Sequence, residues 1–84
     1  MAPDDIRDRQ MARPFQPFRL HMSNGMSVDV RHPEMIVVGD EALTVAVYDE
    51  KKDRVGLNWY SVINVNVIEP LPQEEAKDSA NGTG

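Results

Sequence analysis

The sequence predicts one small all-β domain, and three observations lead to this prediction. Apolar and polar residues alternate with a period of two over several short stretches between residues 18 and 67, which is typical of half-buried strands. Turn-forming pairs such as Asn24-Gly25 and Gly39-Asp40 separate these stretches. Apolar residues are sparse before residue 14 and after residue 71, so the core must come from the segment between them. A chain of 84 residues has room for one such core.

The clearest pattern is a β-hairpin over residues 18–31, where two alternating runs flank Asn24-Gly25. A two-residue loop would place apolar residues opposite polar ones. A three-residue loop with Gly25 in the left-handed conformation keeps apolar residues together and sets Arg19 opposite Asp29, so we expect this register. The expected apolar pairs are Met22 with Met26, Leu20 with Val28, and Phe18 with Val30.

Further strands follow this hairpin. Pro33 forces His32 into an extended conformation and interrupts the pairing. A short apolar strand over residues 35–38 comes next, and residues 61–64 are expected to form one 3₁₀-like turn before a last strand that ends at Pro70. Between them lies a second hairpin around the polar loop 49–53. Its expected pairs are Val47 with Val55, Val45 with Leu57, and Leu43 with Trp59.

Five or six short strands joined mostly as neighbours suggest one bent sheet that closes on itself. We therefore expect a small barrel of SH3-like or Sm-like type over residues 14–71. Residues 1–13 are expected to be a tail or a short helix, in which Asp4 or Asp5 caps the first turn after Pro3. Residues 72–84 are expected to be a disordered acidic tail.

The stretch RPFQPFR at residues 13–19 has the spacing of a PxxP docking peptide. Phe18, however, continues in phase into Leu20, and Arg19 has a partner across the first hairpin. We therefore interpret the stretch as part of the domain, with Phe15 folded over one end of the barrel.

Composition excludes several classes of protein. The chain has no cysteine, so it has neither disulfides nor thiolate metal sites. No apolar run has the length of a membrane span, and the N-terminus lacks the apolar region of a signal peptide; we expect a cytoplasmic protein. The net charge is −5, and residues 14–71 carry five Lys or Arg against eight Asp or Glu. Nucleic acid is therefore a disfavoured partner.

The best candidate for a metal or acid–base site consists of His21, His32 and Glu34. Histidine and carboxylate ligands suit zinc or iron, but in the expected register the two imidazoles leave the hairpin on opposite faces. The chain contains neither a G-x-S-x-G motif nor a Walker loop. We expect no catalytic residue, no metal, no cofactor and no enzyme activity. Trp59 and Tyr60 are of the type that stacks on bases, but Trp59 shares the parity of the core.

Stretches of this sequence resemble two types of bacterial protein. The string RPFQPFRLHMSNGMSVDVRHPEMIVV, followed by TVAVYD, resembles a recurrent type of small bacterial protein of unknown function over about residues 4–69. HMSNGMSVDV (21–30) and GLNWYSVINVNVIEP (56–70) are more loosely similar to bacterial Sm-like RNA chaperones. In those chaperones a Tyr-Lys-His run in the closing motif binds RNA and helps to form a ring. Here NWYSV (58–62) has neither lysine nor histidine, so the resemblance implies the fold more than RNA binding.

The sequence therefore favours a non-enzymatic small β-barrel that acts by protein–protein contact or as a homo-oligomer. The alternatives are an Sm-like RNA-binding module, suggested by arginines near the first hairpin, and a metal-dependent enzyme at His32 and Glu34. The residues expected at an interaction surface are Arg19, His21, Arg31, His32, Tyr60 and Ile68.

Overall fold

A computed structural model describes residues 1–72 of the chain. Apart from Pro72, the tail predicted over residues 72–84 lies outside the described residues. The elements are α1 (Pro3–Met11), β1 (Phe18–Met22), β2 (Ser27–Val30), the 3₁₀ turn η1 (Pro33–Met35), β3 (Ile36–Val38), β4 (Ala42–Asp49), β5 (Arg54–Ser61), the 3₁₀ turn η2 (Val62–Asn64) and β6 (Val65–Pro70). The described part of the chain is thus mostly β, as predicted.

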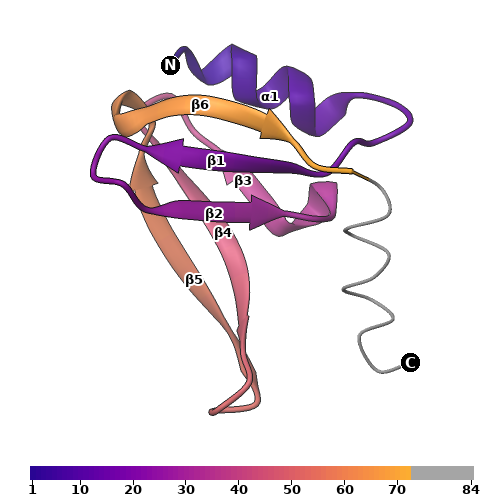
Figure 1. The fold of residues 1–84 in the computed structure, drawn as a ribbon, viewed down its shortest axis with the longest axis vertical. Helices are drawn as coiled ribbons and strands as arrows, with labels where there is room; N and C mark the ends of the chain where they lie inside the picture. The colour runs from indigo at the N-terminus through magenta and orange to yellow at the C-terminus, as the bar shows by residue number, and fades with distance from the viewer. Residues whose placement is uncertain (73–84) are drawn as a thin grey trace.

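The strands form two antiparallel sheets of three strands each, with the orders β2-β1-β6 and β3-β4-β5 (Figure 1). Among residues 1–72 no strand pairing joins the two sheets into one continuous ladder. Their inner faces enclose the core together with one helix residue and Leu71. The buried apolar side chains are Ile6, Phe18, Leu20, Met22, Val28, Val30, Ile36, Leu43, Val45, Val62, Val65 and Leu71.

The first hairpin has the predicted register and loop. Arg19 lies opposite Asp29, and Leu20 lies opposite Val28. The Met22 N–H donates to the Met26 carbonyl at 2.8 Å, and Gly25 has φ +88°, a backbone conformation that glycine adopts without steric cost. Pattern and turn chemistry agree here, so the three-residue loop prediction is confirmed.

A predicted turn between β3 and β4 is also present at Gly39-Asp40. The Gly39 N–H donates to the Ala42 carbonyl at 2.8 Å. A Cβ atom on Gly39 would lie only 2.9 Å from that same carbonyl oxygen, so the close approach of the two backbones requires glycine.

The predicted register of the second hairpin is wrong by one residue. Val45 lies opposite Asn58 instead of Leu57, and Leu43 lies opposite Tyr60 instead of Trp59. Because side chains alternate along a strand, this shift moves every second residue of β5 to the other side of the sheet.

The cause lies at the tip of the hairpin, where the loop has four residues, 50–53, instead of the expected five. The Asp49 carboxylate accepts the backbone N–H groups of Lys51 and Lys52. Asp53 has φ +51°, and its carboxylate accepts the hydroxyl of Tyr48. These local hydrogen bonds build the shorter loop, and the loop sets the register of both strands.

The last strand contains a β-bulge that the sequence pattern did not reveal. Met22 pairs with Val65 and His21 pairs with Val67, so that Asn66 is the additional residue. The bulge reverses the side-chain parity beyond it. Ile68, which we expected at an interaction surface, is therefore opposite Leu20 and packs against the core.

The short N-terminal helix is present as α1, with its ends close to the expected ones. The predicted cap is wrong, because Ala2 is the N-cap and no side chain caps the helix, while Asp4 and Asp5 lie in its first turn. Ile6 is fully buried in the core. Figure 1 shows α1 beside β6, and its side chains also contact β3, so the helix covers the gap between the two sheets.

The stretch RPFQPFR is part of the fold. Phe18 is 1% exposed, and Phe15 packs on it with ring centroids 5.9 Å apart. The Pro17 carbonyl accepts the Leu71 N–H at 2.8 Å. These contacts are incompatible with a free docking peptide.

Replacing Phe18 with alanine is therefore expected to lower the stability of the domain by about 3–5 kcal/mol, because a fully buried ring is lost. Phe15→Ala, at a half-buried ring, should cost less. Met11→Ala, at an exposed helix position, is the matched control and should leave the melting temperature unchanged. An unchanged melting temperature for both phenylalanine variants, measured by circular dichroism, would restore the docking-peptide interpretation.

Candidate functional site

Three of the predicted surface residues meet on the side of the β2-β1-β6 sheet that points away from the core. Arg19 lies opposite Asp29 on one side and opposite Glu69 on the other. Its guanidinium bonds Asp29 through two N–H···O contacts of 2.6 and 3.2 Å, and one nitrogen lies 4.0 Å from Glu69 Oε1. His21 Nε2 lies 2.7 Å from the same Glu69 oxygen.

Arg31 completes this charged cluster from the end of β2. Its guanidinium donates to Asp29 Oδ2 at 3.2 Å. Asp29 therefore accepts bonds from two arginines, and the hydrogen bond from Arg19 lowers the pKa of the Asp29 carboxyl below its usual value. The Glu69 contacts depend on the β6 bulge, which explains why the sequence pattern revealed only the Arg19–Asp29 pair.

The cluster balances its own charge. Two arginines face two carboxylates across a three-stranded sheet, and the histidine shares one of those carboxylates. Such a surface offers few uncompensated positive charges to a phosphate backbone. Within residues 1–72 no group of three or more His, Asp or Glu side chains is arranged to hold a metal ion.

The remaining predicted surface residues do not join the cluster. His32 is exposed and extended, and its carbonyl accepts the Met35 N–H at 3.1 Å. Tyr60, expected at the surface, packs partly against the core, and its hydroxyl accepts a hydrogen bond from Asn58 at 3.3 Å. Ile68 is likewise partly buried.

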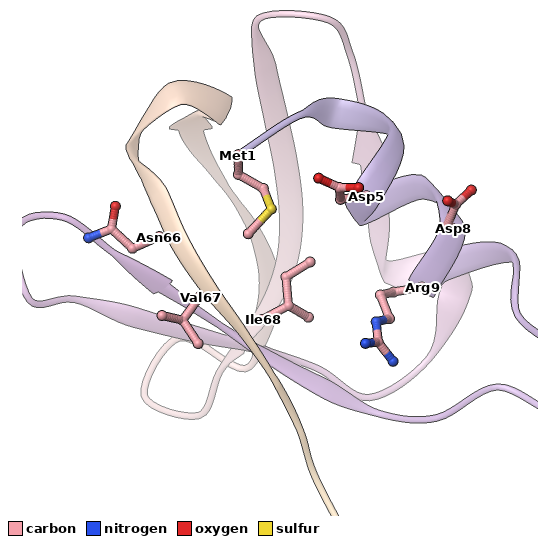
Figure 2. A pocket seen from close by; sticks show the side chains of 7 residues that line it. All are labelled: Met1, Asp5, Asp8, Arg9, Asn66, Val67 and Ile68. Carbon is pink, nitrogen blue, oxygen red and sulfur yellow. The ribbon is translucent and has the colours of Figure 1, made fainter.

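Figure 2 shows Ile68 in a groove between α1 and β6, where the Met1 side chain points toward it. Asp5, Asp8 and Arg9 line the helix side of this groove. It combines a small apolar floor with exposed charges of both signs and contains no nucleophile beside a base. Its lining therefore suits packing of the N-terminus more than catalysis.

Several of the exposed large hydrophobic residues within residues 1–72 lie together on the other sheet, and sequence reasoning missed this surface. We call it the outer face: the side of β3-β4-β5 that points away from the core, defined by Val37, Thr44, Ala46, Tyr48, Val55, Leu57 and Trp59. None of these residues is charged. The exposed fractions are 73% for Trp59, 69% for Val37, 62% for Leu57 and 60% for Val55.

The outer face includes residues that the expected register had assigned to the core. Trp59 was expected to share the parity of the core, but its side chain is exposed in the described chain. The signal that would have revealed the face is the tip chemistry at Asp49 and Asp53, because it fixes the loop length.

The β4–β5 hairpin also extends beyond the rest of the domain, as Figure 1 shows. All residues of β5 except Tyr60 are exposed. A two-stranded ribbon is only marginally stable in water, and here both of its faces are open toward the tip. Most of β5 therefore lacks cover from the rest of the described chain.

No protein-family model, curated protein or solved structure matches this chain. Within residues 1–72, no helix has the length and apolar character required to cross a membrane.

The charged cluster predicts a specific pH dependence of stability. Because the pKa of Asp29 is lower in the folded chain than its unfolded value of about 3.9, ionised Asp29 stabilises the fold fully above that pH. This contribution is lost as the pH falls through the lower, folded-state pKa. Thermal unfolding between pH 7 and pH 2 should therefore show that Asp29→Asn lowers the melting temperature at neutral pH, and that the difference from the unmodified protein shrinks below about pH 4. A difference that stays constant over this range would contradict the assigned role of Asp29.

Proposed function

We propose that this chain is a non-enzymatic interaction domain that assembles with itself through the outer face of β3-β4-β5, as a small barrel of SH3-like or Sm-like type. The observation that supports the proposal is a continuous sheet face of seven uncharged residues that includes the exposed Trp59 on β5. Exposed apolar patches of this kind mark interaction sites in soluble proteins.

The composition of the outer face is that of an interface core. Tryptophan and tyrosine are enriched at the energetic centres of protein interfaces, while charged residues are depleted there. Full burial of an aliphatic side chain such as Leu57 contributes about 1.5–3 kcal/mol. The face therefore offers a substantial apolar contribution to any partner that covers it.

Charges surround the outer face instead of interrupting it. Asp40 and Glu41 lie at the base of the β4–β5 hairpin, and residues 49–54 at its tip combine three acids with Lys51, Lys52 and Arg54. A polar rim around an apolar centre is the usual arrangement at protein interfaces.

The absence of cysteine favours assembly in the cytoplasm.

The RNA-binding alternative has less support. Three arginines suggested it: Arg13, Arg19 and Arg31. Arg19 and Arg31 are ion-paired with Asp29, and Arg13 donates to backbone carbonyls at the end of α1. The exposed Trp59 is surrounded on its own face by aliphatic and polar residues without an arginine.

Light scattering over a range of protein concentrations tests the proposal. The protein should form a defined oligomer, and Leu57→Lys should weaken assembly about tenfold or more because it places a charge in the apolar face. Met11→Lys is the matched control, since Met11 is 67% exposed on the helix that covers the opposite edge of the sheet. Trp59 is the only tryptophan, so its fluorescence maximum should move to shorter wavelength as the oligomer forms. A monomer at all concentrations, with unshifted fluorescence, would overturn the proposal.

A further inference from the structure

The two edges of the β3-β4-β5 sheet differ in whether their outward backbone groups have hydrogen-bond partners. At the β3 edge, the Ile36 and Val38 carbonyls point away from β4. Gln10 donates to the Ile36 carbonyl at 2.8 Å, and Arg7 donates to the Val38 carbonyl at 3.2 Å. Helix α1 thus satisfies this edge, as covered edges in natural sheets require.

The β5 edge has no such cover in the described part of the chain. The Val62 N–H donates to the Glu41 carbonyl at 2.8 Å. Because hydrogen-bonded pairs alternate along an antiparallel pair of strands, the even-numbered residues of β5 are the ones that bond to β4. The N–H and C=O groups of Val55, Leu57 and Trp59 therefore point outward. Within residues 1–72 no strand or side chain bonds to them.

We infer that β5 pairs antiparallel with β5 of a second copy of this chain, in a register centred on Leu57. The inference rests on the proposed self-assembly and names its partner, and it uses the backbone edge of β5 beside the outer face. The result is a six-stranded sheet that runs through both copies and carries two outer faces on one side.

Symmetry permits this pairing. Antiparallel strands related by a twofold axis that is perpendicular to the sheet present the same face on the same side, and each strand offers its own outward groups to the other. No charged residue and no proline occurs between Val55 and Ser61. Beyond Arg54 at its first position, β5 thus lacks the charges and prolines by which natural edges prevent such pairing.

The side chains select the register. Centred on Leu57, the pairing sets Leu57 opposite its own copy and Val55 opposite Trp59 of the second copy, so every apolar residue of β5 on the outer face meets an apolar residue. A shift of the centre to Asn58 would set Val55 opposite Ser61. Aromatic and β-branched cross-strand pairs are the more stable arrangement.

The charges at the two ends of the hairpin are complementary in this arrangement. The tip of one copy, with Lys51 and Lys52, lies alongside the base of the other, where Glu41 is exposed. Asp40, beside Glu41, is already ion-paired with Arg7 of its own chain at 3.1 Å. Asp49 is already engaged with backbone groups of its own loop. The lysine-bearing tip therefore meets Glu41 at the base of the second copy.

Proline substitutions separate edge pairing from folding. Leu57→Pro removes an N–H that points away from β4, so the hairpin should persist while the dimer dissociates at least tenfold more readily than that of Leu57→Ala, which keeps the N–H. Asn58→Pro removes an N–H that bonds to β4 and should lower the melting temperature. Equal dimerisation of Leu57→Pro and Leu57→Ala, with the fold verified by circular dichroism, would overturn the inference.

Single-cysteine variants test the register, and the natural chain has no cysteine to interfere. Paired Leu57 residues would have Cα atoms about 5.5 Å apart, within the range of a disulfide, whereas copies of Val55 would be about 13 Å apart along the strands. Under mild oxidation Leu57→Cys should form a covalent dimer, Val55→Cys should not, and a mixture of Val55→Cys with Trp59→Cys should form the mixed dimer.

The two proposals fail in different ways. A dimer in which Leu57→Cys does not cross-link, or in which Val37→Cys at the far edge cross-links instead, would overturn edge pairing while leaving self-assembly through the outer face intact. A protein that is monomeric under all conditions would overturn both.

Discussion

The hydrogen bonds at the tip of the β4–β5 hairpin determine which side chains this domain buries and which it presents. The Asp49 carboxylate accepts the backbone N–H groups of Lys51 and Lys52, and Asp53 takes the left-handed conformation. Together they hold a four-residue loop. A loop one residue longer would turn Val55, Leu57 and Trp59 inward. The apolar outer face, the outward amides of β5 and the proposed assembly all depend on this local geometry.

The domain is complete on one side and open on the other. On the α1 side, Ile6 enters the core while Arg7 and Gln10 satisfy the carbonyls of β3. On the β5 side, the apolar side chains and the backbone edge are both exposed. A chain of this length buries a thin core, so a second copy that covers β5 would add stability as well as assembly, and the two would depend on protein concentration together.

The sequence predicted the first hairpin correctly because two independent signals agreed there. Gly25 required the left-handed position, and the three-residue loop also kept Phe18, Leu20 and Met22 on one face. The second hairpin offered one signal only. Matching apolar residues across the strands favoured a core position for Leu57 and Trp59, since the pattern cannot distinguish a side chain buried within its own chain from one buried by a partner.

The charged cluster was partly predictable for a similar reason. The Arg19–Asp29 pair followed from the register of the first hairpin. Glu69 and His21 came together through the bulge at Asn66, which has no signature in the alternation of residues 65–70. The same bulge turned Ile68 inward. Backbone irregularities and loop length, instead of residue type, account for each error in the predicted surface.

The central claim is that another copy of the chain covers the outward edge of β5. Amide hydrogen exchange of Val55, Leu57 and Trp59, measured by NMR at low and at high protein concentration, tests this claim most directly. The account predicts that these three amides exchange rapidly in the dilute protein and become protected as concentration rises, while those of the even-numbered neighbours are protected throughout. Exchange of the three amides that is equally fast at both concentrations would contradict it.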